Sequence, residues 1–121
     1  MPAEKTDVNA MANPAPLIAV VIPAYNAAKS IATVLTKIPA LVDLIVVVND
    51  ASPDNLEAVV SQSSDPRVHL LTHTRNQGVG GAMLTGYAYA LEQGADIVVK
   101  IDSDDQMDLD FSEPALFLRM V

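Results

Sequence analysis

The chain has 121 residues, of which 50% are hydrophobic and none is cysteine, and its formal net charge at pH 7 is -8. This length and hydrophobic content allow one domain with a real core, and the absence of cysteine excludes disulfides and thiolate metal sites. The negative charge argues against sequence-independent binding to nucleic acid or anionic lipid. An anionic ligand such as a phosphate would need a cation between it and the protein.

The first 16 residues are polar and rich in small side chains, and they lack the basic-then-apolar pattern of a signal peptide. We expect them to form a flexible N-terminal tail, with the folded domain over residues 17–121. No apolar run approaches the roughly 20 residues of a membrane-spanning helix. These features fit a cytoplasmic protein, including one that works at the cytoplasmic face of a membrane.

Four apolar runs predict buried strands over residues 17–22, 44–48, 68–72 and 96–101. Between these runs, apolar residues recur at helical spacing and predict helices over 28–38, 54–62 and 82–92. Pro39 stops the first helix, and Ser52 with Pro53 looks like the start of the second. Gly94 fits the end of the third helix. A last helix is expected from Ser112 to the end of the chain.

This alternation predicts an α/β fold, with a doubly wound, mainly parallel sheet and helices on both faces. In the common strand order 3-2-1-4, the first and fourth strands are neighbours at the point where ligands bind. Three polar or irregular strand ends would then meet along one edge: residues 23–26, 49–52 and 102–106. We therefore expect the functional site at this edge.

The most informative stretch is IVVKIDSDDQMD, residues 97–108. In an extended segment Asp102, Asp104 and Gln106 fall on one side, and their oxygens suit a hard cation such as Mg²⁺ or Mn²⁺. Two alternatives stay open. The first alternative to a Mg²⁺ or Mn²⁺ site is a solvated acidic loop. The second is a calcium loop of the EF-hand kind over residues 102–113. The second alternative conflicts with Met107, which stands where such a loop needs glycine.

Other candidate residues carry weaker signals. Asp50 ends an otherwise apolar strand, where it is either a turn residue or an acceptor for a base edge; its place beside Asp102 favours the second. Gly78 and Gly80 form an incomplete dinucleotide-like loop, or a glycine-rich helix entry that lets the backbone approach a neighbour. The two histidines, His69 and His73, are assigned no role.

Four segments together resemble the N-terminal half of family 2 glycosyltransferases, which have the Rossmann-like GT-A fold: VIPAYN (21–26), VVVNDASPDN (46–55), NQGVGGAMLTGYAYALEQGAD (76–96) and KIDSDDQMD (100–108). The resemblance runs from about Leu17 to the C-terminus and rests on the order and spacing of the four. The Asp-x-Asp-x-Gln-x-Asp pattern is most similar to enzymes that transfer sugars to polyprenyl phosphates, the dolichyl-phosphate mannosyltransferase-like branch. Relatives continue well beyond this length, so the chain looks like a truncated nucleotide-sugar-binding part without a catalytic base.

The resemblance implies roles for matching residues. The nucleotide would contact Pro23, Ala24, Tyr25, Asp50, Gly78, Gly80 and Asp102. Within this set, Asp50 would accept a hydrogen bond from the base, and Asp102 would contact the ribose or the cation shell. Asp104 and Gln106 would hold Mg²⁺ or Mn²⁺ against the diphosphate of a UDP- or GDP-sugar. The acceptor would be a polyprenyl phosphate or a glycan.

Two further hypotheses remain beside the metal-dependent glycosyltransferase: a non-catalytic nucleotide-binding or interaction module, and the calcium-binding protein. With a helix as the last element, the strand over 96–101 would be an exposed apolar sheet edge. We therefore expect a second copy of the chain, or a partner chain, to pair with that edge. Nucleic acid is not an expected partner.

Overall fold

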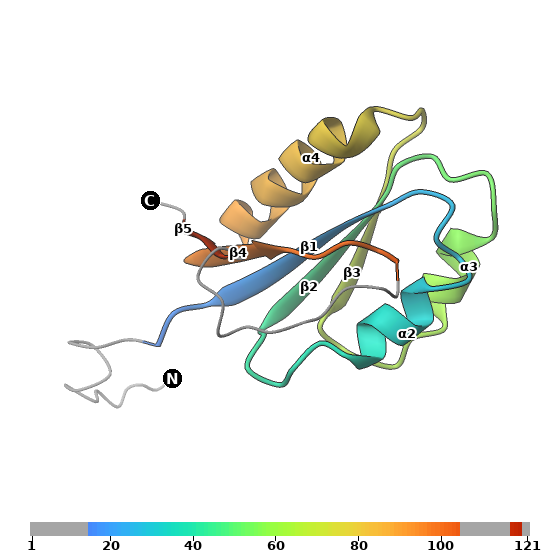
Figure 1. Ribbon diagram of the computed structural model, residues 1–121. Helices are drawn as coiled ribbons and strands as arrows, with labels where there is room; N and C mark the ends of the chain where they lie inside the picture. Colours follow the sequence, from blue (N-terminus) through green and yellow to red (C-terminus); the bar gives the residue numbers. More distant parts are fainter. Residues whose placement is uncertain (1–14, 105–116, 120–121) are drawn as a thin grey trace.

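The computed structural model describes residues 15–104 and 117–119 (Figure 1). Within these residues the sheet has the order β3-β2-β1-β4-β5. Four strands are parallel: β1 (Ile18–Ala24), β2 (Leu44–Asn49), β3 (Val68–Thr72) and β4 (Ile97–Lys100). The predicted, mainly parallel sheet is confirmed, and its first four strands have the common order 3-2-1-4 that was assumed in placing the site. The predicted tail, residues 1–16, falls almost wholly outside the described residues.

The fifth strand corrects two predictions. β5 (Phe117–Arg119) pairs with β4 in antiparallel orientation, where a helix running to the end of the chain was predicted. The open backbone groups along β4 offer hydrogen bonds that a short strand satisfies, and this pairing outweighs a local helical preference. β4 is therefore paired on both sides, and the prediction that it is an unpaired edge awaiting another chain is wrong.

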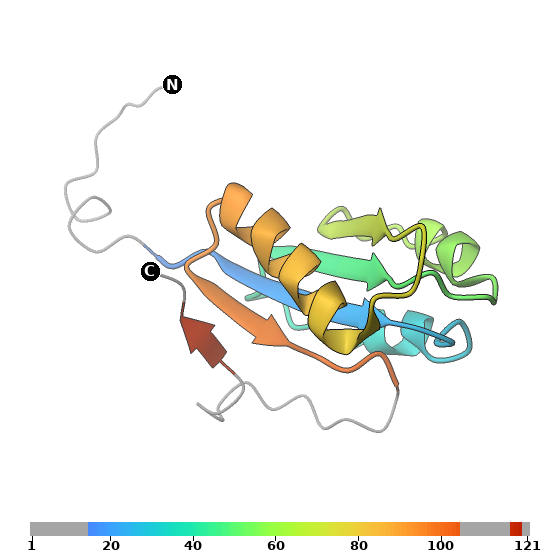
Figure 2. The same cartoon turned by 90° about the horizontal axis from the view of Figure 1, so that it is seen from above.

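The helices cover both faces of the sheet, as predicted. Helix α4 (Gly78–Glu92) lies along one face, while α2 (Ile31–Thr36) and α3 (Leu56–Ser61) lie against the other (Figures 1 and 2). Alternate residues of β1 enter the two cores: Val20 and Ile22 pack with α2 and α3, and Val21 packs with α4. Because β1 is apolar on both faces, it forms the centre of the molecule.

Helix α4 lies close to β1 because residue 86 is glycine. A Cβ placed on Gly86 would come within 2.3 Å of Val21 Cγ1, far closer than two carbon atoms pack. A side chain at residue 86 would therefore push the helix away from the sheet. The N-terminus of α4 borders the edge where β1, β2 and β4 end, so this approach also places the start of the helix.

Helix ends differ from the predictions. Helix α3 begins after Asn55, whereas Ser52 and Pro53 stay in the preceding loop. Helix α4 begins at Gly78, four residues before the predicted start, and Gly94 follows it with a φ of +88°, as expected for a helix end. No helix in the described part of the chain is long and apolar enough to span a membrane.

Candidate functional site

The predicted strand ends meet at one cavity of about 330 Å³. It lies at the C-terminal ends of β1, β2 and β4, beside the start of α4. Its lining consists of Pro23, Ala24, Tyr25, Asp50, Val79, Ala82, Asp102, Ser103 and Asp104. Val79 lines the cavity between the two predicted glycines, Gly78 and Gly80. Gln106, the other predicted metal ligand, lies outside the described residues.

The loop after β1 supplies an aromatic wall to this cavity. Tyr25 is 48% exposed, so its ring is available to a flat ligand. The next residue, Asn26, has a φ of +56°, and its backbone N–H donates to Ser52 Oγ over 2.8 Å. The Ala28 N–H donates to Asp54 Oδ2 over 3.0 Å. These two bonds tie the loop after β1 to the loop after β2.

Asp54 is the centre of that connection. Its carboxylate accepts hydrogen bonds from the Ser52 hydroxyl and from the backbone N–H groups of Ala28 and Leu56. The bond from Ser52, helped by those from the backbone, holds the pKa of Asp54 below its ordinary value against the opposing effect of desolvation. The ionised carboxylate of Asp54 therefore holds the loop after β1 against the loop after β2.

Asp50 lies at the end of β2 with its side chain only 4% exposed. Its Oδ1 accepts from His73 Nδ1 and from the Gln77 N–H, each over 2.8 Å, and its Oδ2 accepts from the Gly78 N–H over 2.9 Å. Burial is the largest influence on the pKa of Asp50 and raises it, but the bonds from His73, Gln77 and Gly78 together lower it below the ordinary value. Asp50 is thus an ionised hydrogen-bond acceptor in the lining of the cavity.

The start of α4 depends on this carboxylate. Gly78 has a φ of +82°, a conformation that favours glycine, and its N–H points to Asp50. Gly80 has open space where a side chain would stand. The predicted glycine-rich helix entry is therefore present, and Gly78 is the glycine that its backbone conformation requires. No pattern in the sequence indicated that Asp50 would bind the backbone at this helix entry.

The acidic stretch begins directly after β4. Ile101 is buried, while Asp102 and Asp104 are exposed to solvent, and Lys100 Nζ lies 3.5 Å from Asp102 Oδ1. The Ser30 hydroxyl, at the start of α2, donates to the Ser103 carbonyl over 2.7 Å. The start of the stretch is therefore attached to the α2 side of the sheet, while Asp102 and Asp104 are exposed to water at the cavity.

The donor type of Asp102 and Asp104 fits a hard divalent cation. Both residues line the same cavity, and carboxylate oxygens are ligands that Mg²⁺ and Mn²⁺ prefer. Within residues 15–104 and 117–119, no three histidine, cysteine or acidic side chains cluster as a metal site. Gln106, which was predicted as a further ligand, lies outside the described residues. The element that enters the acidic stretch is a strand, which disagrees with the helix of an EF-hand.

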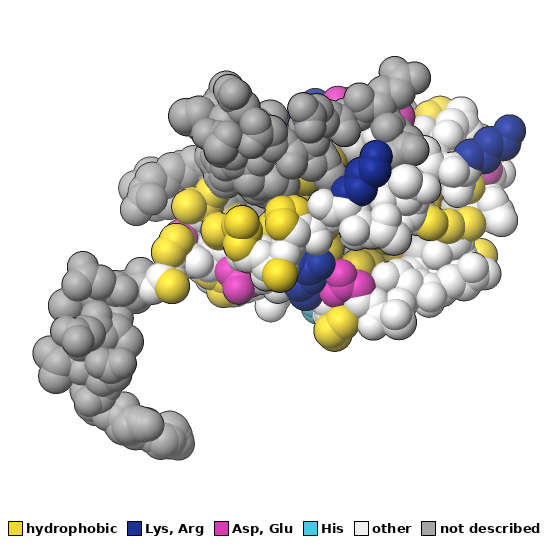
Figure 3. Space-filling model, turned by 60° about the horizontal axis from the view of Figure 1, so that its bottom comes forward, with side chains coloured by type: hydrophobic (Ala, Val, Ile, Leu, Met, Phe, Trp, Pro, Cys, Tyr) yellow, Lys and Arg dark blue, Asp and Glu magenta, His cyan; other side chains and the backbone are white. Residues whose placement is uncertain are grey.

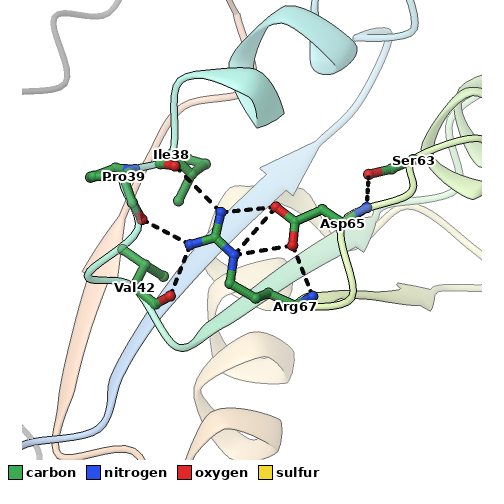
Figure 4. Close-up of polar contacts among 6 residues, drawn as sticks. All are labelled: Ile38, Pro39, Val42, Ser63, Asp65 and Arg67. Carbon is green, nitrogen blue, oxygen red and sulfur yellow. Dashed lines mark hydrogen bonds and ion pairs between the residues drawn. The ribbon is translucent and has the colours of Figure 1, made fainter.

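A larger cavity of about 630 Å³ lies on the face of the sheet that α2 and α3 cover, between these two helices and the loop before β3. Its cation, Arg67, is already engaged: the guanidinium binds Asp65 and the carbonyls of Ile38, Pro39 and Val42 (Figure 4). The bond to Asp65 raises the pKa of Arg67, and the same bond lowers that of Asp65. This group fixes the loop before β2, so we interpret it as structural.

The face of the molecule in Figure 3 shows lysine and arginine side chains that are separated from one another, some beside acidic ones. Among the described residues visible in this view, these side chains do not form one continuous basic patch of the kind that a polyanion binds.

A comparison with known protein families identifies the family of this chain. The family model described as glycosyl transferase family 2 matches residues 19–117. The chain belongs to glycosyl transferase family 2. The resemblance noted in the sequence is therefore confirmed, and the cavity lies within the matched region of this family 2 chain.

Curated relatives carry names from the same branch. The chain is 38% identical over 88 residues to an undecaprenyl-phosphate mannosyltransferase from Micrococcus luteus, with 69% of this chain and 36% of that protein covered. It is 35% identical over 105 residues to UDP-N-acetylglucosamine--dolichyl-phosphate N-acetylglucosaminyltransferase from Methanococcus voltae, covering 74% of this chain and 42% of the relative. The family 2 chain thus spans well under half the length of these relatives.

Solved structures agree on the GT-A fold. Glucosyl-3-phosphoglycerate synthase from Mycobacterium tuberculosis, crystallised with Mn²⁺, UDP and glucosyl-3-phosphoglycerate, is 28% identical with a TM-score of 0.61, over 79% of this chain and 36% of that one. Mannosyl-3-phosphoglycerate synthase from Rubrobacter xylanophilus has a TM-score of 0.66 at 21% identity, over 84% and 36% of the two chains, and shows the fold alone.

Proposed function

We propose that this chain is the nucleotide-sugar-binding portion of a metal-dependent glycosyltransferase that uses a UDP- or GDP-sugar. The observation that carries the proposal is the single cavity that Tyr25, Asp50, Asp102 and Asp104 line together. The aromatic ring of Tyr25 and the buried acceptor Asp50 suit a base, and the exposed carboxylates of Asp102 and Asp104 at the same strand edge suit the ribose and a cation that binds the diphosphate. The Mn²⁺ and UDP named for the similar crystal structure support this assignment.

In the proposed complex the base lies against Pro23, Ala24 and Tyr25, and a ring N–H of the base donates to Asp50. Asp50 suits this role because it is ionised and its position is fixed by three protein donors. The loops on either side are tied together by Asp54, so the aromatic wall is in place before the ligand arrives. Binding then orders few additional groups, which favours affinity.

The diphosphate lies at the acidic stretch. Asp104 and Gln106 hold Mg²⁺ or Mn²⁺, and Asp102 contacts the ribose or the cation shell. The cation, when bound, supplies the positive charge that the diphosphate requires and that this acidic surface lacks. The bond from Ser30 to the Ser103 carbonyl orients the backbone between the two carboxylates.

A polyprenyl phosphate is the acceptor that the names of the relatives favour, with a glycan as the alternative. A phosphate acceptor is already a nucleophile, so we assign no catalytic base within this chain. Such an acceptor would bring the protein to the cytoplasmic face of a membrane. A non-catalytic nucleotide-binding module would use the same cavity, and a sugar-transfer assay with polyprenyl phosphate separates the two.

The test of the proposed function is metal-dependent binding. UDP and GDP are titrated calorimetrically into the chain with Mn²⁺, with Mg²⁺ and with a chelator. We expect binding only with metal, and Asp104→Ala should weaken it at least about tenfold, or about 1.4 kcal/mol. Glu57→Gln, on the exposed side of α3, is the matched loss of a carboxylate away from the cavity and should bind as the wild type does. Equal affinity with and without metal would exclude the proposal.

A further inference from the structure

Three hydrogen-bonded side chains, those of Asp50, His73 and Thr85, connect the ends of β2 and β3 to α4 beside the cavity that Asp50 lines. His73, which follows β3, places Nδ1 2.8 Å from Asp50 Oδ1 and Nε2 2.8 Å from Thr85 Oγ1 on α4. The His73 side chain is only 8% exposed. Its backbone N–H donates to the Asn49 carbonyl over 2.8 Å, so both the main chain and the ring of His73 attach to the end of β2.

The hydrogen bonds determine which ring nitrogen of His73 carries a proton. An ionised carboxylate can only accept, so Nδ1 must be the donor to Asp50 Oδ1. A threonine hydroxyl can donate or accept, so Nε2 keeps its partner in Thr85 with or without a proton of its own. The geometry therefore requires the Nδ1–H form of the imidazole, and it holds the ring at both nitrogens.

This arrangement also decides which oxygen of Asp50 is available. Oδ1 already accepts from His73 and from the Gln77 N–H, whereas Oδ2 accepts only from the Gly78 N–H among the described contacts. A carboxylate oxygen has about two lone-pair sites, so Oδ2 retains one for a ligand. Asp50 lines the cavity beside Val79, the residue that follows Gly78.

We propose that His73 is a positioning residue for nucleotide recognition: through Asp50 it selects Oδ2 as the acceptor for the base and fixes the entry to α4. This inference rests on the proposed function. The ligand group that it implies is a ring N–H donor, as uracil and guanine carry. Without His73, the Asp50 carboxylate can rotate, and the Gln77 and Gly78 N–H groups lose a fixed partner.

Two substitutions separate the contacts of His73. The side-chain amide nitrogen of asparagine lies near the position of His73 Nδ1. His73→Asn therefore keeps the hydrogen bond to Asp50 and loses the hydrogen bond to Thr85. The longer glutamine side chain places its amide near the position of His73 Nε2. His73→Gln therefore keeps the hydrogen bond to Thr85 and loses the hydrogen bond to Asp50. Both variants remove the ring, and a purely packing role would affect them alike. His69→Gln is the control, because His69 contacts Tyr89 and lies outside the cavity lining.

The first measurement uses nuclear magnetic resonance without any nucleotide. The imidazole nitrogens of wild-type His73 should show the Nδ1–H form, and hydrogen exchange at the Gln77 and Gly78 amides should speed up in His73→Gln much more than in His73→Asn. The imidazole spectrum needs no variant, so it tests the arrangement even if a variant fails to fold. An Nε2–H tautomer, or equal exchange in both variants, would overturn the inference.

The second measurement titrates UDP with Mn²⁺ into the same proteins. We expect His73→Gln to bind at least about tenfold more weakly than wild type, and His73→Asn and His69→Gln to stay within about threefold, because only His73→Gln lacks a bond to the charged acceptor. Equal losses in the two His73 variants would overturn the inference. A wild-type chain that binds no nucleotide would instead contradict the proposed function, while the exchange measurement still decides whether His73 holds Asp50.

Discussion

Asp50 illustrates how one residue can serve the fold and the site together. From the sequence it was either a turn residue or an acceptor for a base. The structure places it in the cavity lining and also gives it three protein donors. The sequence could indicate its place at a strand end, but not the His73 contact, because residues 50 and 73 become neighbours only when β2 and β3 pair. The base contact itself stays a prediction.

The carboxylates around the loops make stability depend on pH. The pKa values of Asp50, Asp54 and Asp65 are all held below 3.8, their ordinary value. Because these groups bind protons less readily when folded, their contribution is complete above about pH 3.8 and is lost as pH falls toward the folded pKa values. We expect the unfolding midpoint in urea to drop over that acidic range.

Asp54→Asn provides the matched variant for this pH effect. It should be less stable than wild type near neutral pH, because the amide cannot replace an ionised acceptor for Ser52 and two backbone N–H groups. The difference between the two proteins should shrink as the wild-type carboxyl becomes protonated. A difference that stays constant from about pH 6 to about pH 2.5 would contradict the account of Asp54.

At the scale of elements, the close packing of α4 on β1 is the feature that sets the cavity. Gly86→Ala places a methyl group against Val21, so we expect a loss of about 1–3 kcal/mol in unfolding free energy. Gly80→Ala is the control on the same helix. Its Cβ meets open space, and alanine should raise stability by about 0.5–1 kcal/mol. Chemical denaturation measures both, and equal stabilities for the two variants would refute this account of the packing.

The elements were largely predictable because their apolar patterns are strong. The four parallel strands and the helices on both faces followed from runs such as Leu44–Asn49, which is buried along its whole length. The strand order is the common one for such a fold and could not be read from the runs themselves. The start of α3 was not predictable, because Ser52 and Pro53 fit a helix start locally while Ser52 binds Asn26 and Asp54 instead. β5 was missed because its stability comes from pairing with β4 rather than from its own sequence.

At the scale of the whole molecule, the family is established and the activity is a proposal. The described residues carry a GT-A sheet whose strand ends converge on one cavity, and the chain spans 36% and 42% of two curated relatives. The position of the cavity followed from topology alone, since ligands bind where the strand order reverses. Its candidate metal ligands, Asp104 and Gln106, were predicted from the acidic stretch. Asp104 lines the cavity together with Asp102, and Gln106 lies outside the described residues.

We propose that a nucleoside diphosphate and a divalent cation bind in the cavity at the ends of β1, β2 and β4. Paramagnetic broadening by Mn²⁺ in the amide spectrum, recorded with UDP, tests this claim directly, because the larger cavity beside Arg67 lies on the other face of the sheet. We predict that the amides of Tyr25, Asp50 and Ser103 broaden while those of Gln62 and Arg67 stay sharp. Broadening centred on Gln62 and Arg67, or none that depends on UDP, would contradict the claim.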